Sequence, residues 1–241
     1  MSLSSELIIF IHIPKAGGMS LRSIIQANYR EEEVFFIESS DYQDSYSRLD
    51  RIVESRDTAL KLIGGHVGFG IHERFSAHAR YMTILRNPVS RVASLYNYII
   101  RSHSHYLHQE LVTSRLSLEA FAKSQLTPEL SNDQTRMLSG VGNALGFSDK
   151  CEDTLELAKA NMQTMFRVVG LVERFEETVG VMAKAFEWSA QPLPRVNVTP
   201  AKAASAVTSK AIAAIKERNY LDLKLYDYAE RAFEKLLRDS R

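Results

Sequence analysis

The sequence predicts an α/β protein with a three-layer fold, in which a mainly parallel sheet is flanked by helices on both faces. Short apolar segments rich in β-branched residues alternate with longer segments that show helical spacing. The first such segment, residues 8–13, is a continuous apolar run, which is typical of a central parallel strand buried on both faces. A chain of 241 residues with 45% hydrophobic residues can bury a substantial core, so we expect a single domain over residues 1–241.

The expected strands are short apolar runs, and most precede a segment with apolar residues at helical spacing. Residues 41–56 are polar with Tyr42, Tyr46 and Leu49 on one face, which favours an amphipathic surface helix. Residues 192–200 contain three prolines and are expected to form an extended loop. Strands are expected at 8–13, 34–37, 60–63, 81–85 and 168–171. Helices are expected at about 19–29, 41–56, 88–100, 118–124, 132–138, 152–166, 174–188, 210–218 and 221–237.

The helix after the fourth strand has a clear start signal. Asn87 is a good N-cap, and Pro88 is suited to the first helical position. Apolar spacing predicts that Val92 and Tyr96 face the core, while Arg91 lies on the opposite, polar side.

Charge, cysteine content and hydropathy exclude several classes of protein. The net charge of +1 gives no support for a nucleic-acid-binding protein, so an anion site must be local. The single cysteine, Cys151, cannot form an internal disulfide and suits a reducing compartment. The longest early apolar run, residues 7–13, is well below the ~20 residues of a membrane-spanning helix. We therefore expect a soluble cytoplasmic protein with no signal peptide, no membrane span and no nucleic-acid partner.

The segment Pro14-Lys15-Ala16-Gly17-Gly18 joins the first strand to the first helix. Glycines let the backbone approach a ligand closely, and the free N–H groups of a helix start favour an anion. Lys15 adds a cation and Ser20 a hydroxyl donor to the same turn. The strand, turn and helix together predict a phosphate-binding site.

Three of the expected strands end in residues that can act on a phosphate compound. In open parallel sheets, ligands bind outside the carboxyl ends of the strands. The first, third and fourth strands lead to Lys15, His66 and Arg86, and His66 lies in a segment with four glycines in seven residues, 64–70. We therefore expect the three side chains to converge on one ligand.

The order of the first turn distinguishes between phosphate compounds. In the ATP/GTP P-loop the lysine follows the glycines, whereas Lys15 precedes them. The strand followed by Pro-Lys-x-Gly-Gly-x-Ser-Leu resembles the 5′-phosphosulfate loop of sulfotransferases that use 3′-phosphoadenylyl sulfate (PAPS). Residues 12–18, His-Ile-Pro-Lys-Ala-Gly-Gly, are most similar to the carbohydrate-type branch, which includes the heparan sulfate 2-O- and 6-O-sulfotransferases.

Further segments extend this resemblance, in patches, from about residue 8 to residue 233. Residues 83–96 are similar to the 3′-phosphate motif of the family, R-[DN]-P-x-x-R-x-x-S-x-Y. Residues 65–67, Gly-His-Val, resemble the segment that carries the catalytic base of the 2-O branch. Segment 132–140 resembles an N-x-Q-T stretch near the acceptor cleft of the family. Segment 169–176 resembles a strand-to-helix signature, and segment 219–226 resembles the C-terminal helix pair.

The resemblance implies a P-loop-like, sulfotransferase-type fold and an enzyme that transfers a sulfuryl group from PAPS to an acceptor hydroxyl without a metal. The branch implies a carbohydrate acceptor. His66 is implied as the general base, and Lys15 as the residue that stabilises the leaving group; an imidazole with an ordinary pKa near ~6.5 suits the first role. Arg86 and Ser94 are implied to hold the 3′-phosphate. The loop residues implied to bind the cofactor are Lys15, Ala16, Gly17, Gly18, Met19, Ser20 and Leu21.

Two departures from the family pattern concern the site. The family loop usually carries hydroxyls at the positions of Ala16 and Met19, so backbone N–H groups and Ser20 must contribute more. Gly64 stands where the 2-O branch has a second histidine, so that branch's acceptor specificity does not carry over.

Two other functions fit part of the pattern. An ATP-dependent small-molecule kinase with an atypical P-loop would require Mg²⁺, but Arg86 stands where a metal-binding aspartate would be expected. A catalytically silent nucleotide-binding module is favoured only by the missing loop hydroxyls.

Other titratable residues have weaker claims. His72 and Glu73 are alternative bases, while His12 is expected to be a packed histidine near the site and Cys151 to be inert. The cluster of His103, His105 and His108 is expected to be a solvated helix end or an acceptor-facing rim rather than a metal site.

Overall fold

The computed structural model describes residues 6–38, 41–55, 59–75, 78–141, 152–189 and 207–239. Within these ranges a five-stranded sheet has the order β2-β3-β1-β4-β5, and every pair of neighbouring strands is parallel. The predicted α/β class with a parallel sheet is confirmed, whereas the extent of the domain, 1–241, stays a prediction. The strands are β1 (Leu7–Ile11), β2 (Val34–Ile37), β3 (Leu62–Gly65), β4 (Ala79–Leu85) and β5 (Phe166–Leu171).

The first strand lies at the centre of the sheet. All five residues of β1 are buried, and Ile9 is paired with Ile63 of β3 on one side and Tyr81 of β4 on the other. A strand with neighbours on both sides and helices on both faces has no solvated face, which explains its uninterrupted apolar sequence. The carboxyl ends of β3, β1 and β4 are therefore adjacent.

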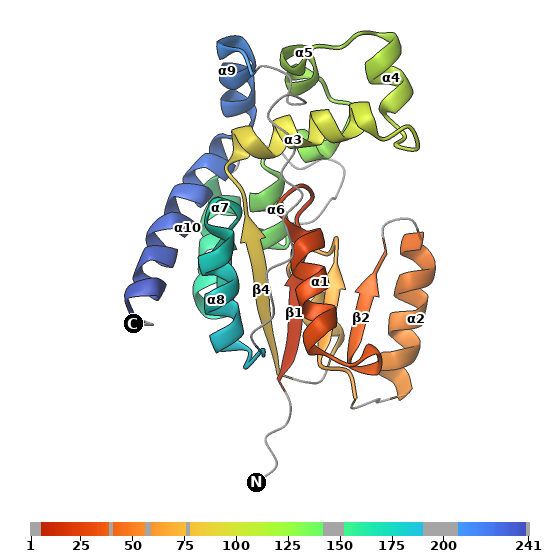
Figure 1. Ribbon diagram of the computed structural model, residues 1–241, viewed down its shortest axis with the longest axis vertical. Helices are drawn as coiled ribbons and strands as arrows, with labels where there is room; N and C mark the ends of the chain where they lie inside the picture. Colours follow the sequence, from red (N-terminus) through yellow and green to blue (C-terminus); the bar gives the residue numbers. More distant parts are fainter. Residues whose placement is uncertain are drawn as a thin grey trace.

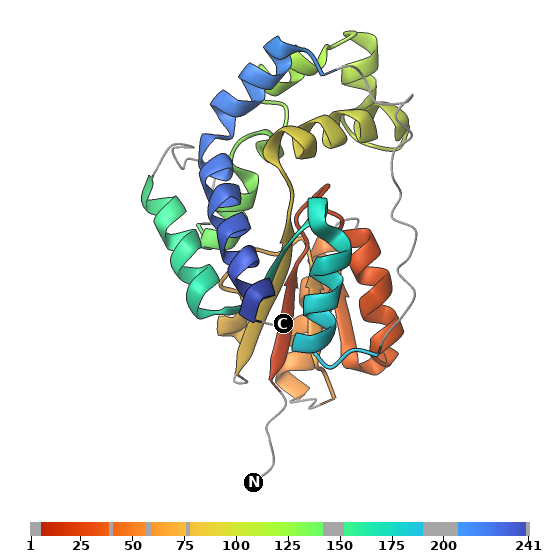
Figure 2. The ribbon, with the colours of Figure 1, turned by 60° about the vertical axis from the view of Figure 1, so that its left-hand side comes forward.

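Helices cover both faces of the sheet. Figure 2 shows α1 and α8 on one face and α7 and α10 on the other. The helices of the described residues are α1 (Gly18–Asn28), α2 (Tyr42–Ser55), α3 (Pro88–Arg101), α4 (His108–Thr113), α5 (Leu118–Lys123), α6 (Asp133–Ser139), α7 (Glu152–Thr164), α8 (Phe175–Ala185), α9 (Ser209–Arg218) and α10 (Tyr220–Asp239). Short 3₁₀ turns are η1 (Glu31–Glu33), η3 (Ile71–Arg74), η4 (Pro128–Leu130) and η5 (Val172–Arg174).

A second group of helices lies beyond the carboxyl ends of the strands. Figure 1 shows α3 crossing above the sheet, with α4, α5 and α9 grouped around it. These helices share a separate apolar cluster that includes Val92, Ile99, Phe121 and Ile215. The ends of the central strands therefore face a helical cap, which we define as α3, α4, α5 and α9.

Two local predictions differ from the structure. β3 runs through Gly64 and Gly65, which were expected to be loop, because both residues pair with β1 on one side and with β2 on the other. A Cβ at Gly64 would lie 2.6 Å from the Phe36 ring, so this strand position requires glycine. Arg91 was predicted on the polar side of its helix but is fully buried, because its guanidinium contacts Asp133 at 3.4 Å and donates to the Glu129 carbonyl at 2.6 Å.

For the remaining helices and strands, most of the predicted ends lie within about two residues of the observed ends. Helix α4 was not predicted. The predicted loop at 192–200 and Cys151 lie outside the described residues. Among the helices of the described residues, none combines the length and apolar character that crossing a membrane requires.

Candidate active site

The turn between β1 and α1 presents an open helix start. Gly17 is the N-cap with φ 75°, and no side chain caps the helix. The N–H groups of Ser20 and Leu21 both reach the Gly17 carbonyl at 3.2 Å, but no described residue accepts a hydrogen bond from the N–H of Gly18 or Met19. Unsatisfied donors at a helix N-terminus attract an anion.

The side chains of the predicted loop residues differ in what they can offer. Ala16 and Leu21 are buried in the core, so only their backbones can face a ligand, and the Ala16 N–H already donates to the Ile13 carbonyl at 3.2 Å. Met19 is 66% exposed and Ser20 is half-buried. Ser20 is therefore the side-chain hydroxyl that this turn offers.

Gly18 is required by the side chain beneath it. A Cβ at Gly18 would lie 1.8 Å from Cδ2 of His12, so the loop rests directly on the imidazole ring. His12 in turn stacks between Phe10, with ring centroids 5.5 Å apart, and His66, at 4.4 Å. The phosphate-binding turn and the predicted base thus share one packing partner.

We expect Gly18→Ala to destabilise the protein and to weaken its affinity for 3′-phosphoadenosine 5′-phosphate, the nucleotide product of the reaction that the resemblance implies. Forcing a methyl group onto a packed ring typically costs about 1–3 kcal/mol, which for a chain of this size lowers Tm by several degrees. Thermal unfolding and calorimetric titration of the nucleotide measure the two effects. The matched control is Gly180→Ala in α8, where a Cβ has no neighbour within 4 Å. Equal Tm values for Gly18→Ala and wild type would contradict this packing.

His66 is held in one tautomer. Its Nδ1 lies 2.7 Å from the His12 carbonyl oxygen, which can only accept, so Nδ1 carries the proton of the neutral ring. The other ring nitrogen, Nε2, is left unprotonated. Burial lowers the pKa of His66 below its ordinary value of 6.5, against a smaller opposite effect of the hydrogen bond to His12. The ring is therefore neutral near pH 7 and can accept a proton at Nε2.

His12 makes the stability of the fold sensitive to acid. Burial, reinforced by His66 and by the cations Arg22 and Lys15, lowers the pKa of His12 from 6.5 to about 3. Below pH 6.5 the unfolded chain binds a proton that the folded chain excludes, so stability is full above 6.5 and decreases as pH falls toward 3. The decrease is at most about 1.4 kcal/mol for each pH unit.

Urea unfolding at pH 7, 6, 5 and 4 measures this dependence. We expect the unfolding free energy of His12→Gln to depend less steeply on pH than that of wild type, since glutamine does not titrate. His78→Gln serves as a comparison, because His78 lies just before the amino end of β4, whereas the candidate site lies at the carboxyl ends of the strands. Parallel pH profiles for wild type and His12→Gln would contradict the assignment.

Arg86 follows β4 and contacts the turn. Its Nη1 donates to the Lys15 carbonyl at 3.0 Å, so the two residues that are predicted to bind phosphate, Lys15 and Arg86, are in contact. Gln134 holds the Arg86 backbone, because its Oε1 accepts from the Arg86 N–H and its Nε2 donates to the Arg86 carbonyl, both at 2.9 Å. Within the described residues, the buried Nε of Arg86 has no hydrogen-bond partner. Ser94 lies half-buried in the second turn of α3.

Positive charge is concentrated around Lys15. Its backbone has φ 65°, an uncommon conformation for a residue with a Cβ, and its Nζ lies 3.9 Å from the centroid of the Tyr98 ring. Burial, then Arg86 and Arg101, lower the pKa of Lys15, whereas Glu129 raises it. Burial also lowers the pKa of Arg86. Both shifts show that the two cations are partly withdrawn from water, where a bound anion would stabilise their charged forms.

Other predicted candidates are placed elsewhere or used internally. Nδ1 of His72 is hydrogen-bonded to the Tyr81 hydroxyl at 2.7 Å, so this alternative base contacts β4 rather than the turn. His103 and His108 bond to each other, at 3.1 Å. In the part of the chain that the structure describes, no group of three or more His, Cys, Asp or Glu residues is placed to hold a metal ion.

Two neighbours of the site, Tyr98 and Glu129, were not predicted from the sequence, whereas Gln134 belongs to the segment 132–140 that resembles a stretch near the acceptor cleft. The position of Tyr98, four residues after Ser94, was a usable signal, because residues i and i+4 share one face of a helix. Glu129 had no such signal. The position of Glu129 depends on the buried Arg91, which donates to the Glu129 carbonyl. Burial raises the pKa of the Glu129 carboxyl to about 7.

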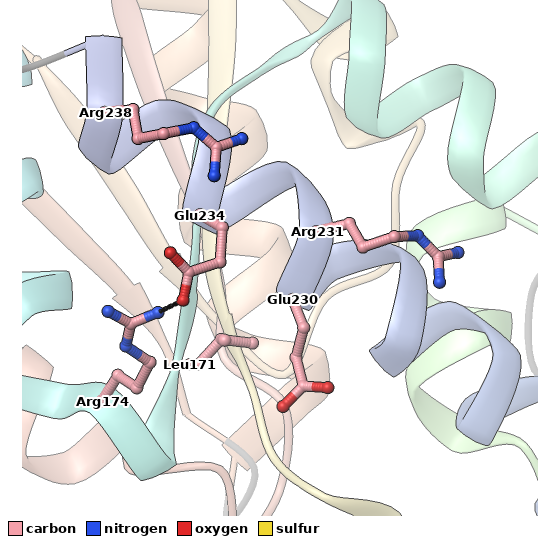
Figure 3. Close-up of a pocket in the computed structure, with 6 residues that line it drawn as sticks. All are labelled: Leu171, Arg174, Glu230, Arg231, Glu234 and Arg238. Atoms are coloured by element: carbon pink, nitrogen blue, oxygen red, sulfur yellow. Dashed lines mark hydrogen bonds and ion pairs between the residues drawn. The ribbon is translucent and has the colours of Figure 1, made fainter.

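A surface groove of about 620 Å³ lies beside α10 and η5. Figure 3 shows three arginines and two glutamates lining it, with Arg174 paired to Glu234. Its charges are mixed, with Arg174 paired to Glu177 and Glu234, and none of its lining residues belongs to the predicted phosphate site. Its lining residues are Leu171, Arg174, Glu230, Arg231, Glu234 and Arg238.

The parallel sheet, the open helix start after its central strand and the adjacent cations are the features of an α/β protein with an anion-binding site at its strand ends. The comparison with protein families makes this class specific. A family model described as "Sulfotransferase family" matches residues 4–229. The chain belongs to the sulfotransferase family and is a PAPS-dependent sulfotransferase that acts on an acceptor hydroxyl. The predicted sulfotransferase-type fold and PAPS as co-substrate are thereby confirmed.

The comparison with solved structures found two sulfotransferases, both with low similarity to this chain. Mouse SULT7A1, crystallised with PAP, is 13% identical with a TM-score of 0.46, over 96% of this chain and 83% of that one. A sulfotransferase from Alicyclobacillus acidocaldarius is 14% identical with a TM-score of 0.44, over 89% of this chain and 96% of that one. No curated protein sequence matches this chain. The family assignment rests on the family match alone.

Proposed function

We propose that the chain transfers a sulfuryl group from PAPS to a carbohydrate hydroxyl, with His66 as the general base. The observation that carries this proposal is the hydrogen bond from His66 Nδ1 to the His12 carbonyl, since it leaves Nε2 free to take a proton. The lowered pKa of His66 keeps the ring in its neutral, basic form near neutrality.

In the proposed reaction PAPS supplies the sulfuryl group. His66 Nε2 accepts the proton of the acceptor hydroxyl, whose oxygen forms a bond to sulfur while the bond from sulfur to the phosphate oxygen breaks. The Lys15 ammonium stabilises the negative charge that develops on the departing phosphate, and 3′-phosphoadenosine 5′-phosphate (PAP) is the product. Positioning and charge stabilisation dominate such a transfer, by analogy with phosphoryl transfer.

The turn after β1 and the residues that follow β4 would each bind one phosphate of the nucleotide. We propose that the 5′-phosphate is held by Lys15 and the backbone N–H groups of the turn, together with the Ser20 hydroxyl. Arg86 and Ser94 would hold the 3′-phosphate, and the unpartnered Nε of Arg86 supports this, because a buried guanidinium without a full set of acceptors favours an anion. The proposed set is Lys15, Ala16, Gly17, Gly18, Met19, Ser20, Leu21, Arg86 and Ser94.

The carbohydrate nature of the acceptor and a cytoplasmic location are also proposals. The first rests on the resemblance of residues 12–18 to the carbohydrate-type branch, and the second on the single cysteine of the sequence.

Calorimetry and a transfer assay together test the function. We expect PAP to bind more tightly than ATP, with an affinity that does not depend on Mg²⁺, whereas a kinase would prefer ATP with Mg²⁺. We also expect ³⁵S-labelled PAPS to label oligosaccharides from a mixed glycan panel. Labelling of phenols or amines but of no glycan would contradict the proposed acceptor.

A further inference from the structure

Three aromatic side chains contact one another in series, starting at Lys15. The Tyr98 ring, 3.9 Å from Lys15 Nζ, meets His105 edge-on, with ring centroids 5.7 Å apart and an angle of 87°. His105 stacks on Tyr106 with centroids 4.7 Å apart and an angle of 24°. We call Tyr98, His105 and Tyr106 the aromatic platform.

The aromatic platform is open to solvent. Tyr98 is 41% exposed and Tyr106 is 70% exposed, so both rings present much of their surface to solvent. Figure 1 shows the segment after α3 at the outer end of that helix, beyond the strand ends. Exposed rings beside a reacting centre are available to a second substrate.

Hydrogen bonds hold the aromatic platform in place. His108 Nδ1 donates to the Ile99 carbonyl at 2.9 Å, which leaves its Nε2 to accept from His103 Nδ1 at 3.1 Å. This chain of bonds ties the segment after α3 back onto the helix, and the His105 N–H adds a turn bond to the Ser102 carbonyl at 2.9 Å. A surface fixed before binding loses little conformational entropy on binding.

The rim of the platform also carries polar groups. Nδ1 of His105 accepts from the Leu107 N–H at 3.2 Å, so the neutral ring presents Nε2–H as a donor. Burial, with Lys15 and His108 nearby, lowers the pKa of His105 and keeps the ring neutral near pH 7. The two tyrosine hydroxyls add groups that can both donate and accept.

We propose that the aromatic platform binds the acceptor by stacking on one face of a sugar ring, which places a ring hydroxyl beside Lys15. This inference rests on the proposed transfer to a carbohydrate. A sugar ring has C–H groups on its faces, which contact aromatic rings favourably, and hydroxyls on its rim, which match the polar groups of the platform. An acceptor without hydroxyls on its rim would need an enclosed apolar pocket, whereas Tyr106 is mostly exposed.

The test uses the full chain saturated with PAP on a panel of immobilised glycans. Tyr106 is the informative position, because its ring stacks on His105, whereas the ring that contacts Lys15 is that of Tyr98. We expect Tyr106→Ala to weaken glycan binding about tenfold and Tyr106→Phe to keep most of it, with PAP affinity unchanged in both. The matched control is Tyr42→Ala on α2, another exposed tyrosine, at 48% exposure, which should bind glycans as wild type does.

The outcomes separate this inference from the proposed function. Glycan binding that Tyr106→Ala leaves unchanged overturns the aromatic platform but not carbohydrate sulfation. Binding of no glycan, with transfer to 4-nitrophenol instead, overturns both the platform and the carbohydrate acceptor while leaving sulfuryl transfer intact. A fall in PAP affinity in Tyr106→Ala also overturns the platform, because Tyr106 would then support the cofactor.

Discussion

Replacing Lys15 with methionine is expected to lower kcat by about 10²–10³, the usual cost of losing one donor that stabilises transition-state charge. Methionine keeps an unbranched stem against the Tyr98 ring and, like lysine, has a Cβ at the positive φ of this position, so the strain of the turn is unchanged. The loss should therefore fall on turnover rather than on folding. Single-turnover transfer of ³⁵S from PAPS measures it directly.

The control for this prediction is Lys216→Met on α9, which removes an exposed lysine far along the chain and should leave kcat unchanged. Tm values within a degree or two of wild type would show that both variants fold. A Lys15→Met variant with kcat near that of wild type would contradict the assigned role, and a variant that loses only PAP affinity would limit Lys15 to binding.

The second large effect is expected at His66. His66→Gln should lower kcat by about 10²–10⁴ while PAP affinity stays within a few-fold of wild type, since glutamine can still donate to the His12 carbonyl but cannot take a proton. In wild type, kcat/KM should decrease only below pH 6.5, because burial depresses the pKa of His66 and the base is lost when the ring is protonated. A pH series on both proteins measures this acid limb, which should be absent from the residual activity of His66→Gln.

His72→Gln is the matched control, because His72 is the alternative base and its Nδ1 is hydrogen-bonded to the Tyr81 hydroxyl. We expect its kcat to be close to that of wild type. If His72→Gln loses turnover and His66→Gln does not, the base is misassigned.

The sheet could be predicted from the sequence because its central strand has no solvated face. Ile8 to Ile11 are apolar without alternation, and the structure buries every one of them between two parallel neighbours. The convergence of Lys15 and Arg86 could be predicted for a related reason, since strands that are parallel and adjacent deliver their carboxyl ends to one edge.

Other features depend on contacts that spacing along one element does not reveal. Arg91 has the helical position of a surface residue, yet Asp133 and the Glu129 carbonyl, each about 40 residues away in the sequence, provide buried partners. Gly64 is part of a strand because it pairs with β1 and β2, whose aromatic rings occupy the space that a side chain would need. The tautomer of His66 depends in the same way on a carbonyl 54 residues earlier.

The most direct test of the central claim, that the strand ends form one PAPS site, compares the affinities of PAP and 5′-AMP for wild type and Arg86→Met. The two nucleotides differ by the 3′-phosphate that Arg86 is proposed to hold, and the affinity for 5′-AMP controls for damage to the rest of the site. We predict that wild type prefers PAP and that Arg86→Met reduces this preference by about 10–100-fold, the usual worth of a charge-assisted hydrogen bond. An unchanged ratio of the two affinities in Arg86→Met would contradict the account.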